Sequence, residues 1–482
     1  MSRSIRLAVS CSLALAALLC LPTSADAQMA ITRNTQEVGF LSLPGGTNQG
    51  LWAYEDDSGR YCLQTRAGSG LAIVDMNDLS NPTLVGNVPG NFRKVQVWQH
   101  YAYATADATP LTIIDLSDPT NPTVVGGVTA GAHTLRVDQT NGRLYLNRSS
   151  SMLIYDLAAD PIDPPQIGFW AGYAHDSRPD GDIVYVNGFT GAPTRIIRVA
   201  DPQNPVQIGT LPTGNHSSDL FITPTGDRVL ITCDEQTGGH VNLYNVNDPG
   251  NPVALSSYQT ADTGTSVHNV EVKGMYAYIA YYQDQLRILD LSDVTNPIEV
   301  AYWDNNRLNT GSTYSDAWEA IPDHDAIYMG QMYDTNSSVK GVRTIDFFPG
   351  FGTGSEGTNM EVPEAWWTDG PATPGNSDFA MRLTNAAPNT TAYLIVGASN
   401  TMWGPNPLPL GMNDIGAPNA VLYVSPDFLF PAVTDANGNA SLSLPIPSSP
   451  FVTYFVQWLV KDNGAPNPGG WAFSNAGVIH IY

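Results

Sequence analysis

The chain has 482 residues and a formal net charge of −24, with 45 acidic against 21 basic side chains. Such an acidic surface repels nucleic-acid phosphates and anionic lipid headgroups, so we expect neither a nucleic-acid-binding protein nor a membrane-surface protein. Frequent glycine and proline, 44 and 36 residues, and strand-like runs in place of long amphipathic heptads indicate an all-β chain with room for two domains.

Residues 1–27 have the pattern of a secretory signal peptide. A basic start precedes an apolar run, and Ala25-Asp26-Ala27 forms a small-residue cleavage site. We therefore expect export from a bacterial cell, as a secreted or cell-surface protein. No later stretch reaches the roughly 18 apolar residues of a transmembrane helix, so we expect no membrane span after cleavage. We also expect a monomer.

A motif of the form LxIxD, followed by a turn that ends in Asn-Pro, recurs along the chain. Clear copies are "LAIVDMNDLSNP" (71–82), "LTIIDLSDPTNP" (111–122) and "LRILDLSDVTNP" (286–297), and the closing prolines recur every 40 to 47 residues. This period is that of a four-stranded propeller blade. The apolar run predicts a strand buried on both faces, which ends where the aspartate accepts hydrogen bonds from the turn.

Six units of this kind are complete, and a seventh, ending in "VRTIDFFP" (342–349), lacks its fourth strand. The segment "QEVGFLSLP" (36–44) resembles "VQIGTLPTG" (206–214), which is the fourth strand of another unit. Ring closure by this N-terminal strand would remove the exposed sheet edges. We therefore predict a seven-bladed β-propeller over residues 28–350.

The strings "LAIVD", "LTIID" and "LRILD" resemble the repeats of LVIVD-repeat β-propellers. The ordered run "AHTLRVDQTNGRLYL", "YAHD", "NHSSDLFITPTGDRVLITCDE" and "HNVEVKGMYAYIAYYQDQLRILDLSD" is similar to the choice-of-anchor B family of exported bacterial proteins. The resemblance covers about residues 45–350. It implies a propeller on or outside a bacterial cell and brings no settled biochemical activity.

The repeat is lost after a glycine-rich linker, residues 351–360. Runs such as "AYLIVGAS", "YFVQWLVKD" and "GVIHIY" then predict that residues 361–482 form a small β-sandwich accessory domain. Trp458 and Trp471 suit either a sandwich core or a carbohydrate-stacking surface. "DANGNA" (435–440) suits either an Asx-rich turn or a calcium loop.

Two cysteines, Cys62 and Cys233, follow the predicted signal peptide. They fall in blades one and five, which lie far across the ring from each other. A disulfide requires Cα atoms within about 7 Å, so we predict two free, buried thiols.

Four of the eight histidines precede the first strand of four consecutive units. The innermost strands of all blades run in the same direction, so these side chains are expected at one mouth of the central channel. The same register brings further polar residues to this mouth: Arg93 in blade two, Asp316 in blade seven, Asp176 beside one histidine, and Asp234 and Glu235 after the second strand of blade five. The four histidines are His133, His175, His216 and His268.

Three interpretations of these histidines stay open. In the first, they are a feature of the repeat and form hydrogen bonds within the blades. In the second, they bind one transition metal ion, zinc, copper, iron or manganese, with Asp176 and Asp316 in support and with Glu235 or Asp234 as a general base. In the third, the mouth binds a small anionic or sugar-like ligand through Arg93.

The sequence carries no complete catalytic motif of the GxSxG, HExxH or phosphate-loop kind. We therefore expect first an extracellular binding or interaction module, with a protein or a glycan as the candidate partner. The alternative is a metal-dependent hydrolase or oxidoreductase with a histidine-ligated metal at the mouth of the propeller.

Overall fold

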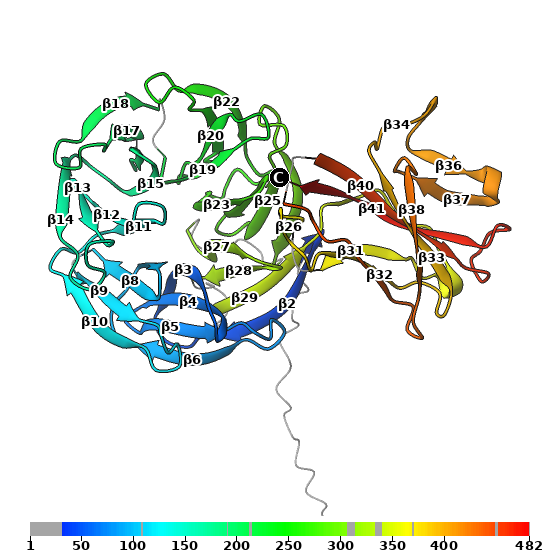
Figure 1. Ribbon diagram of the computed structural model, residues 1–482, viewed down its shortest axis with the longest axis horizontal. Coiled ribbons are helices and arrows are strands. Elements are labelled where there is room, and N and C mark those ends of the chain that lie inside the picture. Colours follow the sequence, from blue (N-terminus) through cyan, green and yellow to red (C-terminus); the bar gives the residue numbers. More distant parts are fainter. Residues whose placement is uncertain are drawn as a thin grey trace, which may run out of the picture.

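The computed structural model describes residues 31–481 except 108, 190, 212–214, 306–313, 333–339, 369–370 and 449–451. The predicted signal peptide lies outside the described residues. The described chain consists of β-strands, connecting turns and two short 3-10 helices, η1 (Thr358–Met360) and η2 (Asn413–Ile415). None of its helices is long and apolar enough to cross a membrane. The predicted all-β fold, a propeller followed by a sandwich, is confirmed (Figure 1).

Seven antiparallel sheets form the blades of the propeller. Blade one contains β3 (Thr47–Asp56), β4 (Gly59–Ala67), β5 (Gly70–Asp75) and β6 (Thr83–Val88). Blade two contains β7 (Lys94–Trp98), β8 (Tyr101–Ala106), β9 (Thr109–Asp115) and β10 (Thr123–Val128). Blade three contains β11 (Thr134–Asp138), β12 (Arg143–Arg148), β13 (Ser151–Asp156) and β14 (Gln166–Ala171). Blade four contains β15 (Asp176–Asp180), β16 (Ile183–Asn187), β17 (Arg195–Arg198) and β18 (Val206–Thr210).

The remaining blades follow the same order. Blade five contains β19 (Ser217–Ile222), β20 (Arg228–Cys233), β21 (Val241–Asn245) and β22 (Val253–Tyr258). Blade six contains β23 (Asn269–Lys273), β24 (Tyr276–Ala280), β25 (Leu286–Asp290) and β26 (Ile298–Asp304). Blade seven contains β27 (Ala317–Asp323), β28 (Ala326–Gln331), β29 (Gly341–Phe347) and β2 (Thr35–Ser42). The first strand of every blade lies innermost, and these seven strands contact one another in a closed ring in which β27 meets β3.

The ring is closed by the N-terminal segment. Strand β2 pairs antiparallel with β29 and is the outer strand of blade seven. A further strand, β1 (Ile31–Arg33), pairs with β26 and adds a fifth strand to blade six. Strand β1 was not predicted, because three residues are too few to show a strand pattern. Backbone hydrogen bonds thereby join the N-terminal segment to blades six and seven.

The LxIxD motif forms a buried strand that ends at its aspartate, as its sequence predicts. In β5 every side chain is buried except that of the final aspartate, which is half-buried. The carboxylates of Asp75, Asp115 and Asp290 each accept a hydrogen bond from the backbone N–H two residues later, at 2.8 Å. The strand therefore ends where the acid satisfies the first donor of the turn.

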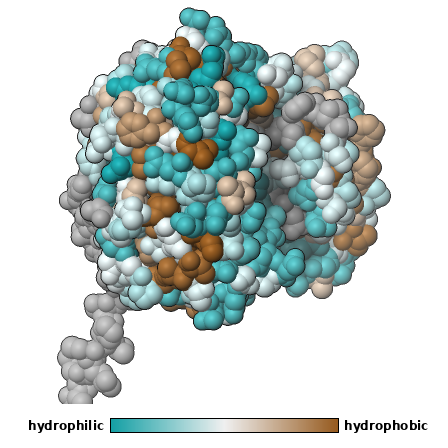
Figure 2. Space-filling model, turned by 60° about the vertical axis from the view of Figure 1, so that its left-hand side comes forward, coloured by the Kyte–Doolittle hydropathy of each residue, from teal (hydrophilic) through white to brown (hydrophobic). Residues whose placement is uncertain are grey.

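The outer strands of the blades carry isolated apolar side chains that are exposed, such as Leu84, Val124 and Val206. Figure 2 shows the side of the propeller that lies at the left of Figure 1, where hydrophobic side chains are scattered among hydrophilic ones. Single exposed apolar residues of this kind are normal on a protein surface. This side of the propeller therefore does not by itself indicate a docking surface.

The second domain is built from two sheets and two short ribbons. The larger sheet contains β30 (Gly350–Phe351), β41 (Trp471–Ile481), β40 (Val452–Lys461), β33 (Thr391–Gly397) and β38 (Phe428–Val433). The smaller sheet contains β31 (Glu364–Thr368), β32 (Ala380–Thr384) and β39 (Ala440–Ser443). The ribbons pair β34 (Met402–Trp403) with β35 (Asn406–Pro407), and β36 (Leu410–Met412) with β37 (Ala417–Leu422).

The contacts of this domain decide two of its open alternatives, those for Trp458 and for residues 435–440. Trp458 is fully buried in the sandwich core, and the ring of Trp471 is half-buried with the Lys461 ammonium 4.5 Å from its centroid. The Asp435 carboxylate accepts backbone hydrogen bonds from Asn437 and Asn439, at 2.8 and 2.9 Å. Trp458 is therefore a core residue, and residues 435–440 form an Asx-rich turn.

The sandwich packs on blades six and seven. The ring of Phe347 meets the indole of Trp367 edge to face with the centroids 5.3 Å apart, and His480 Nε2 lies 3.0 Å from Asp290 Oδ2. The predicted linker is not a free tether, because Phe351 in β30 pairs with β41. Backbone hydrogen bonding along the sandwich thus fixes this segment despite its many glycines.

The two predicted free thiols are confirmed. Cys62 in β4 and Cys233 in β20 are both buried, and neither forms a disulfide. Burial raises the pKa of both thiols above the ordinary value, so both are protonated and unreactive in the folded protein.

Candidate functional site

The four repeated histidines occupy equivalent backbone positions at one mouth of the propeller. Each lies directly before the innermost strand of its blade, and its N–H donates to the carbonyl at the end of the second strand. Arg93 makes the same bond to Thr105, at 2.7 Å, and so holds the equivalent position in blade two. The bonds join His133 to Asn147, His175 to Asn187, His216 to Cys233 and His268 to Ala280, at 2.7 to 3.0 Å.

The imidazole rings form a continuous arc. The ring centroids are 4.5 Å apart between His133 and His175, and 4.4 Å apart both between His175 and His216 and between His216 and His268. The indole of Trp318 in blade seven extends the arc, 4.2 Å from His268. The histidines therefore contact one another across blade boundaries and do not turn back into their own blades.

Three of the rings use Nδ1 to join neighbouring blades. His175 Nδ1 lies 3.4 Å from the carbonyl oxygen of His216, and His216 Nδ1 lies 3.2 Å from that of His268. His268 Nδ1 lies 2.6 Å from the carbonyl oxygen of Trp318. A carbonyl oxygen only accepts, so Nδ1 is the donor in each pair, and Nε2 of the neutral ring carries a lone pair.

Burial keeps these three rings neutral. It lowers the pKa of His175 to about 3, with the neighbouring His133 as the second cause. Burial also lowers the pKa values of His216 and His268 well below the ordinary value. At neutral pH the three Nε2 atoms are therefore unprotonated, which is the state that a metal requires of a histidine ligand.

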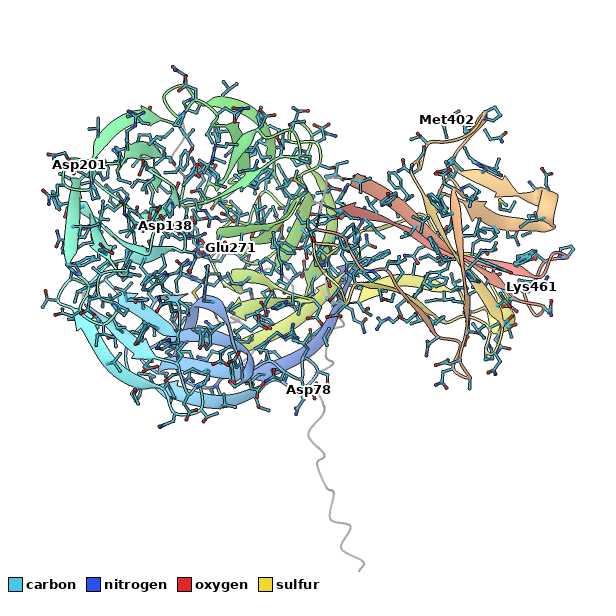
Figure 3. All side chains as sticks on the ribbon, viewed as in Figure 1. Asp78, Asp138, Asp201, Glu271, Met402 and Lys461 are labelled. Carbon is cyan, nitrogen blue, oxygen red and sulfur yellow. The ribbon has the colours of Figure 1, made fainter. Side chains whose placement is uncertain are left out.

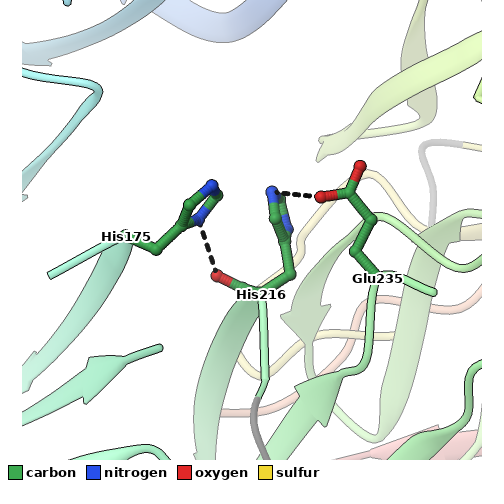
Figure 4. A group of neighbouring side chains, drawn as sticks. All are labelled: His175, His216 and Glu235. Atoms are coloured by element: carbon green, nitrogen blue, oxygen red, sulfur yellow. Dashed lines mark hydrogen bonds and ion pairs between the residues drawn. The ribbon is translucent and has the colours of Figure 1, made fainter. Parts of the chain in front are cut away.

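Glu235 completes the cluster from the end of β20 (Figure 4). Its Oε2 lies 3.3 Å from His216 Nε2, its Oε1 lies 4.0 Å from His268 Nε2, and the Tyr282 hydroxyl donates to Oε1. Burial raises the pKa of Glu235 to about 7, against the hydrogen bond from Tyr282. One candidate ligand atom from each of His175, His216 and Glu235 lies within 4.8 Å of the others.

A proton on Glu235 or a metal ion would relieve the repulsion between the facing lone pairs of this cluster. His216 Nε2 and an ionised Glu235 oxygen both present lone pairs, and at 3.3 Å they repel each other unless a proton or a metal ion bridges them. Nε2 of His268 is buried and has no hydrogen-bond partner among the described residues. Two imidazoles and one carboxylate are a common ligand set for zinc and for non-haem iron, so the donor atoms fit such an ion.

The cluster faces a cavity of about 420 Å³. All four histidines and Glu235 line it, together with the polar Arg93 and Arg148 and the aromatic Tyr173, Phe189 and Trp318. A volume of this size lies within the range of small-molecule sites. Any ion held by the cluster would thus be reached from a space that a small ligand could fill.

Two predicted residues lie at the edge of the cluster or away from it. His133 Nδ1 is 2.6 Å from Asp107 Oδ1, its side chain is 28% exposed, and it does not belong to the three-residue group. Asp234 does not line the cavity, because successive side chains of an extended chain point to opposite sides. Its carboxylate accepts a hydrogen bond from Gln236 instead.

The predicted supporting ligands, Asp176 and Asp316, do not reach the cluster either. Asp176 is buried, and its Oδ1 accepts hydrogen bonds from the Ser177 N–H at 2.7 Å and from the Thr134 hydroxyl at 3.3 Å. Asp316 accepts a hydrogen bond from Ser315 Oγ at 3.1 Å and does not line the cavity. Trp318, two residues after Asp316, extends the arc of rings instead, and its carbonyl oxygen is the acceptor for His268 Nδ1. A β-bulge between Ala317 and Glu319 interrupts the register of β27 at this point.

Ion pairs that the sequence did not reveal join the innermost strands next to this mouth. The pairs are Lys94 with Glu319, Arg136 with Glu271 at 2.7 Å, and Arg178 with Asp219 at 2.7 Å. Figure 3 shows Glu271 at the centre of the ring, whereas Asp78 and Asp201 lie at its rim. Alternating charged residues in a strand are typical of a solvent-facing side, and this pattern concealed their position in the channel.

Three further residues of the site were also missed: Tyr282, Trp318 and Arg148. Tyr282 has a positive φ of 44° in the connection after β24, and this conformation lets its hydroxyl reach Glu235. Arg148 is the last residue of β12. The sequence contains no periodic signal for these residues, since each occurs in only one blade.

The comparisons agree with the repeat pattern. The family model of the LVIVD repeat matches residues 58–90, 89–130 and 264–304, which include most of blades one, two and six. A search of curated proteins found no match to the chain.

Proposed function

Because the chain is an LVIVD-repeat β-propeller whose mouth gathers neutral imidazoles around a carboxylate, we propose that this mouth is a mononuclear transition-metal centre. The ligands are His175 and His216 through Nε2 and Glu235 through its carboxylate, with His268 Nε2 beside them. The observation that carries the proposal is that one candidate ligand atom from each of His175, His216 and Glu235 lies within 4.8 Å of the others, while the buried Nε2 of His268 has no hydrogen-bond partner among the described residues. Zinc and iron are the ions that best suit this donor set.

A purely structural role accounts for Nδ1 of the three histidines His175, His216 and His268, but not for their Nε2 atoms. The Nδ1 bonds join neighbouring blades and would serve a scaffold equally well. The Nε2 atoms of His216 and His268, in contrast, face Glu235 and not backbone groups. A metal ion satisfies all of these lone pairs at once, and it removes the cost of burying them without partners.

We further propose that the centre is catalytic, in a metal-dependent hydrolase or oxidoreductase that acts on a small molecule. Structural metal sites are closed by protein ligands, whereas this cluster borders a cavity of about 420 Å³. A bound zinc or iron ion supplies Lewis acidity or redox chemistry at such a site. Tyr282 would hold Glu235 in position through its hydrogen bond, and the aromatic walls would restrict water.

We place this activity outside the cytoplasm. The support is the signal-peptide pattern of residues 1–27 and the resemblance of the ordered motifs to exported choice-of-anchor B proteins. An extracellular binding role without turnover is the second candidate. It is supported by the same cavity, since a rigid propeller mouth can hold a ligand without reacting with it.

Metal content tests the proposal directly. Residues 28–482 are purified without a histidine tag, incubated separately with zinc, iron, copper and manganese, dialysed, and measured by elemental mass spectrometry. We expect about one ion per chain, lost in His216→Ala and retained in His324→Ala, which changes a half-exposed histidine outside the cluster. Circular dichroism shows whether each variant is folded. A folded wild-type protein that retains none of the four metals would overturn the proposal.

The open coordination of the centre has its own test. Imidazole, a neutral ligand, is titrated into the cobalt-loaded protein while the visible absorption spectrum is recorded. A catalytic centre with a free position changes its spectrum as imidazole binds. An unchanged spectrum would indicate a closed site and would contradict the catalytic role.

A further inference from the structure

We infer that the cavity binds a small organic anion, anchored by Arg93 and Arg148 beside the proposed metal centre and enclosed by aromatic side chains. This inference deepens the proposed function by naming a ligand class. Its anion-binding part does not require the metal.

The first argument is the placement of positive charge. The chain has a net charge of −24, yet two guanidinium groups line this one cavity, beside the carboxylates of Asp107 and Glu235. Within the described part of the chain, Arg148 has no ion pair and no side-chain hydrogen bond. Arg93 makes one ion pair, in which its Nε lies 3.5 Å from Asp107 Oδ2.

The second argument is that Asp107 does not saturate these arginines. Its side chain is 59% exposed, and its other oxygen is engaged by His133 Nδ1 at 2.6 Å. A guanidinium carries five N–H donors, so most donors of Arg93 and Arg148 are left for a ligand. Planar, paired donors of this kind fit carboxylate and phosphate oxygens best.

The third argument concerns the other walls of the cavity. Tyr173, Phe189 and Trp318 present ring surfaces to it. The Arg93 guanidinium lies 5.7 Å from the centroid of Trp318, whose ring in turn lies 4.2 Å from His268. The ring of Trp318 would thus separate an anion held by Arg93 from the histidine cluster. An apolar or aromatic part of the ligand would contact the aromatic side chains of the cavity.

Binding of simple probes tests the inference. Benzoate, phenyl phosphate and the neutral benzamide are titrated into metal-free and zinc-incubated protein by isothermal titration calorimetry. We expect at least one of the two anions to bind tenfold or more tightly than benzamide, because a charged hydrogen-bond pair that benzamide lacks contributes about a factor of ten or more. The comparison of benzoate with phenyl phosphate shows whether a carboxylate or a phosphate is preferred.

Matched arginine variants locate the effect. Arg148→Gln and Arg93→Gln should each weaken binding of the preferred anion about tenfold and leave binding of benzamide unchanged. Arg198→Gln, which removes an exposed arginine on blade four, should change neither. The Arg93 variant also checks the assignment if loss of Arg148 disturbs folding.

The outcomes separate this inference from the metal proposal. Anion selectivity in metal-free protein that takes up no metal supports the inference and rejects the metal centre. Metal uptake without preference for either anion over benzamide rejects the inference and leaves the metal centre standing. Anion selectivity that survives both arginine substitutions would also overturn it, because the anion would then be held by another group.

Discussion

Replacement of Lys94 by methionine should destabilise the propeller in a way that depends on pH. The side chains of Lys94 and Glu319 are 5% and 1% exposed, and they form a buried ion pair in the channel. In Lys94→Met, Glu319 still accepts a hydrogen bond from the Leu51 N–H at 2.7 Å but loses its positive partner. Burial already raises the pKa of Glu319 with the lysine present, so without it the carboxyl group will hold a proton at neutral pH.

The loss of unfolding free energy in Lys94→Met follows from the free energy needed to keep Glu319 protonated in the folded state. The unfolded chain carries a glutamate with an ordinary pKa of about 4.3, so keeping the folded carboxyl protonated costs about 4 kcal/mol at pH 7 and about 1 kcal/mol at pH 5. The sign follows from the raised folded pKa. Folding of the variant takes up a proton, so its stability falls as pH rises through neutrality. The expected loss at pH 7, about 4 kcal/mol, also agrees with the roughly 3–5 kcal/mol typical of breaking a buried ion pair.

Urea unfolding followed by tryptophan fluorescence at pH 5 and pH 7 measures this difference. Wild type, Lys94→Met and the double variant Lys94→Met/Glu319→Gln are compared at both pH values. The single variant should lose about 3 kcal/mol more at pH 7 than at pH 5. The double variant should show no such difference, because its amide does not titrate in this range. An equal loss for the single variant at both pH values would refute the reasoning, since it would mean that Glu319 stays ionised without the lysine.

Three further outcomes are expected. Tyr282→Phe should weaken zinc binding about tenfold, because it removes the hydrogen bond that orients the glutamate ligand; a competition assay with a chelating dye measures this. Cys62 and Cys233 should not react with a thiol reagent in the native protein and should both react after unfolding in urea, which absorbance records. His480→Ala should raise amide hydrogen exchange in β41 and β25, where the imidazole contacts Asp290, while exchange in blades one to four stays unchanged.

Much of the fold could be predicted because short, contiguous segments of the sequence specify it. Each LxIxD strand and its turn lie within about a dozen residues, and their recurrence specifies a blade without knowledge of distant contacts. The likeness between residues 36–44 and 206–214 pointed to the segment that pairs with β29. Strand β1 carries no pattern of this kind, and neither does the edge strand β38.

The site could be predicted only where the repeat itself carries it. The histidines share one register, so their meeting at one mouth followed from the blade pattern. Counting along the repeat placed Asp316 at the mouth, but Trp318, two residues later, lies beside His268, and a β-bulge between Ala317 and Glu319 interrupts the register there. Asp234 is one position from Glu235, and of these two only Glu235 lines the cavity. Tyr282 belongs to a connection outside the repeat, where only the folded chain shows what it contacts.

The pairing of β2 with β29 has a consequence for how the chain reaches its final form. Residues 35–42 are synthesised well before their partners, residues 341–347. The ring therefore cannot close while the chain is emerging from the ribosome, and the early strand edge stays open until nearly the whole propeller has been made. Contacts over so many residues slow folding and leave intermediates exposed to aggregation.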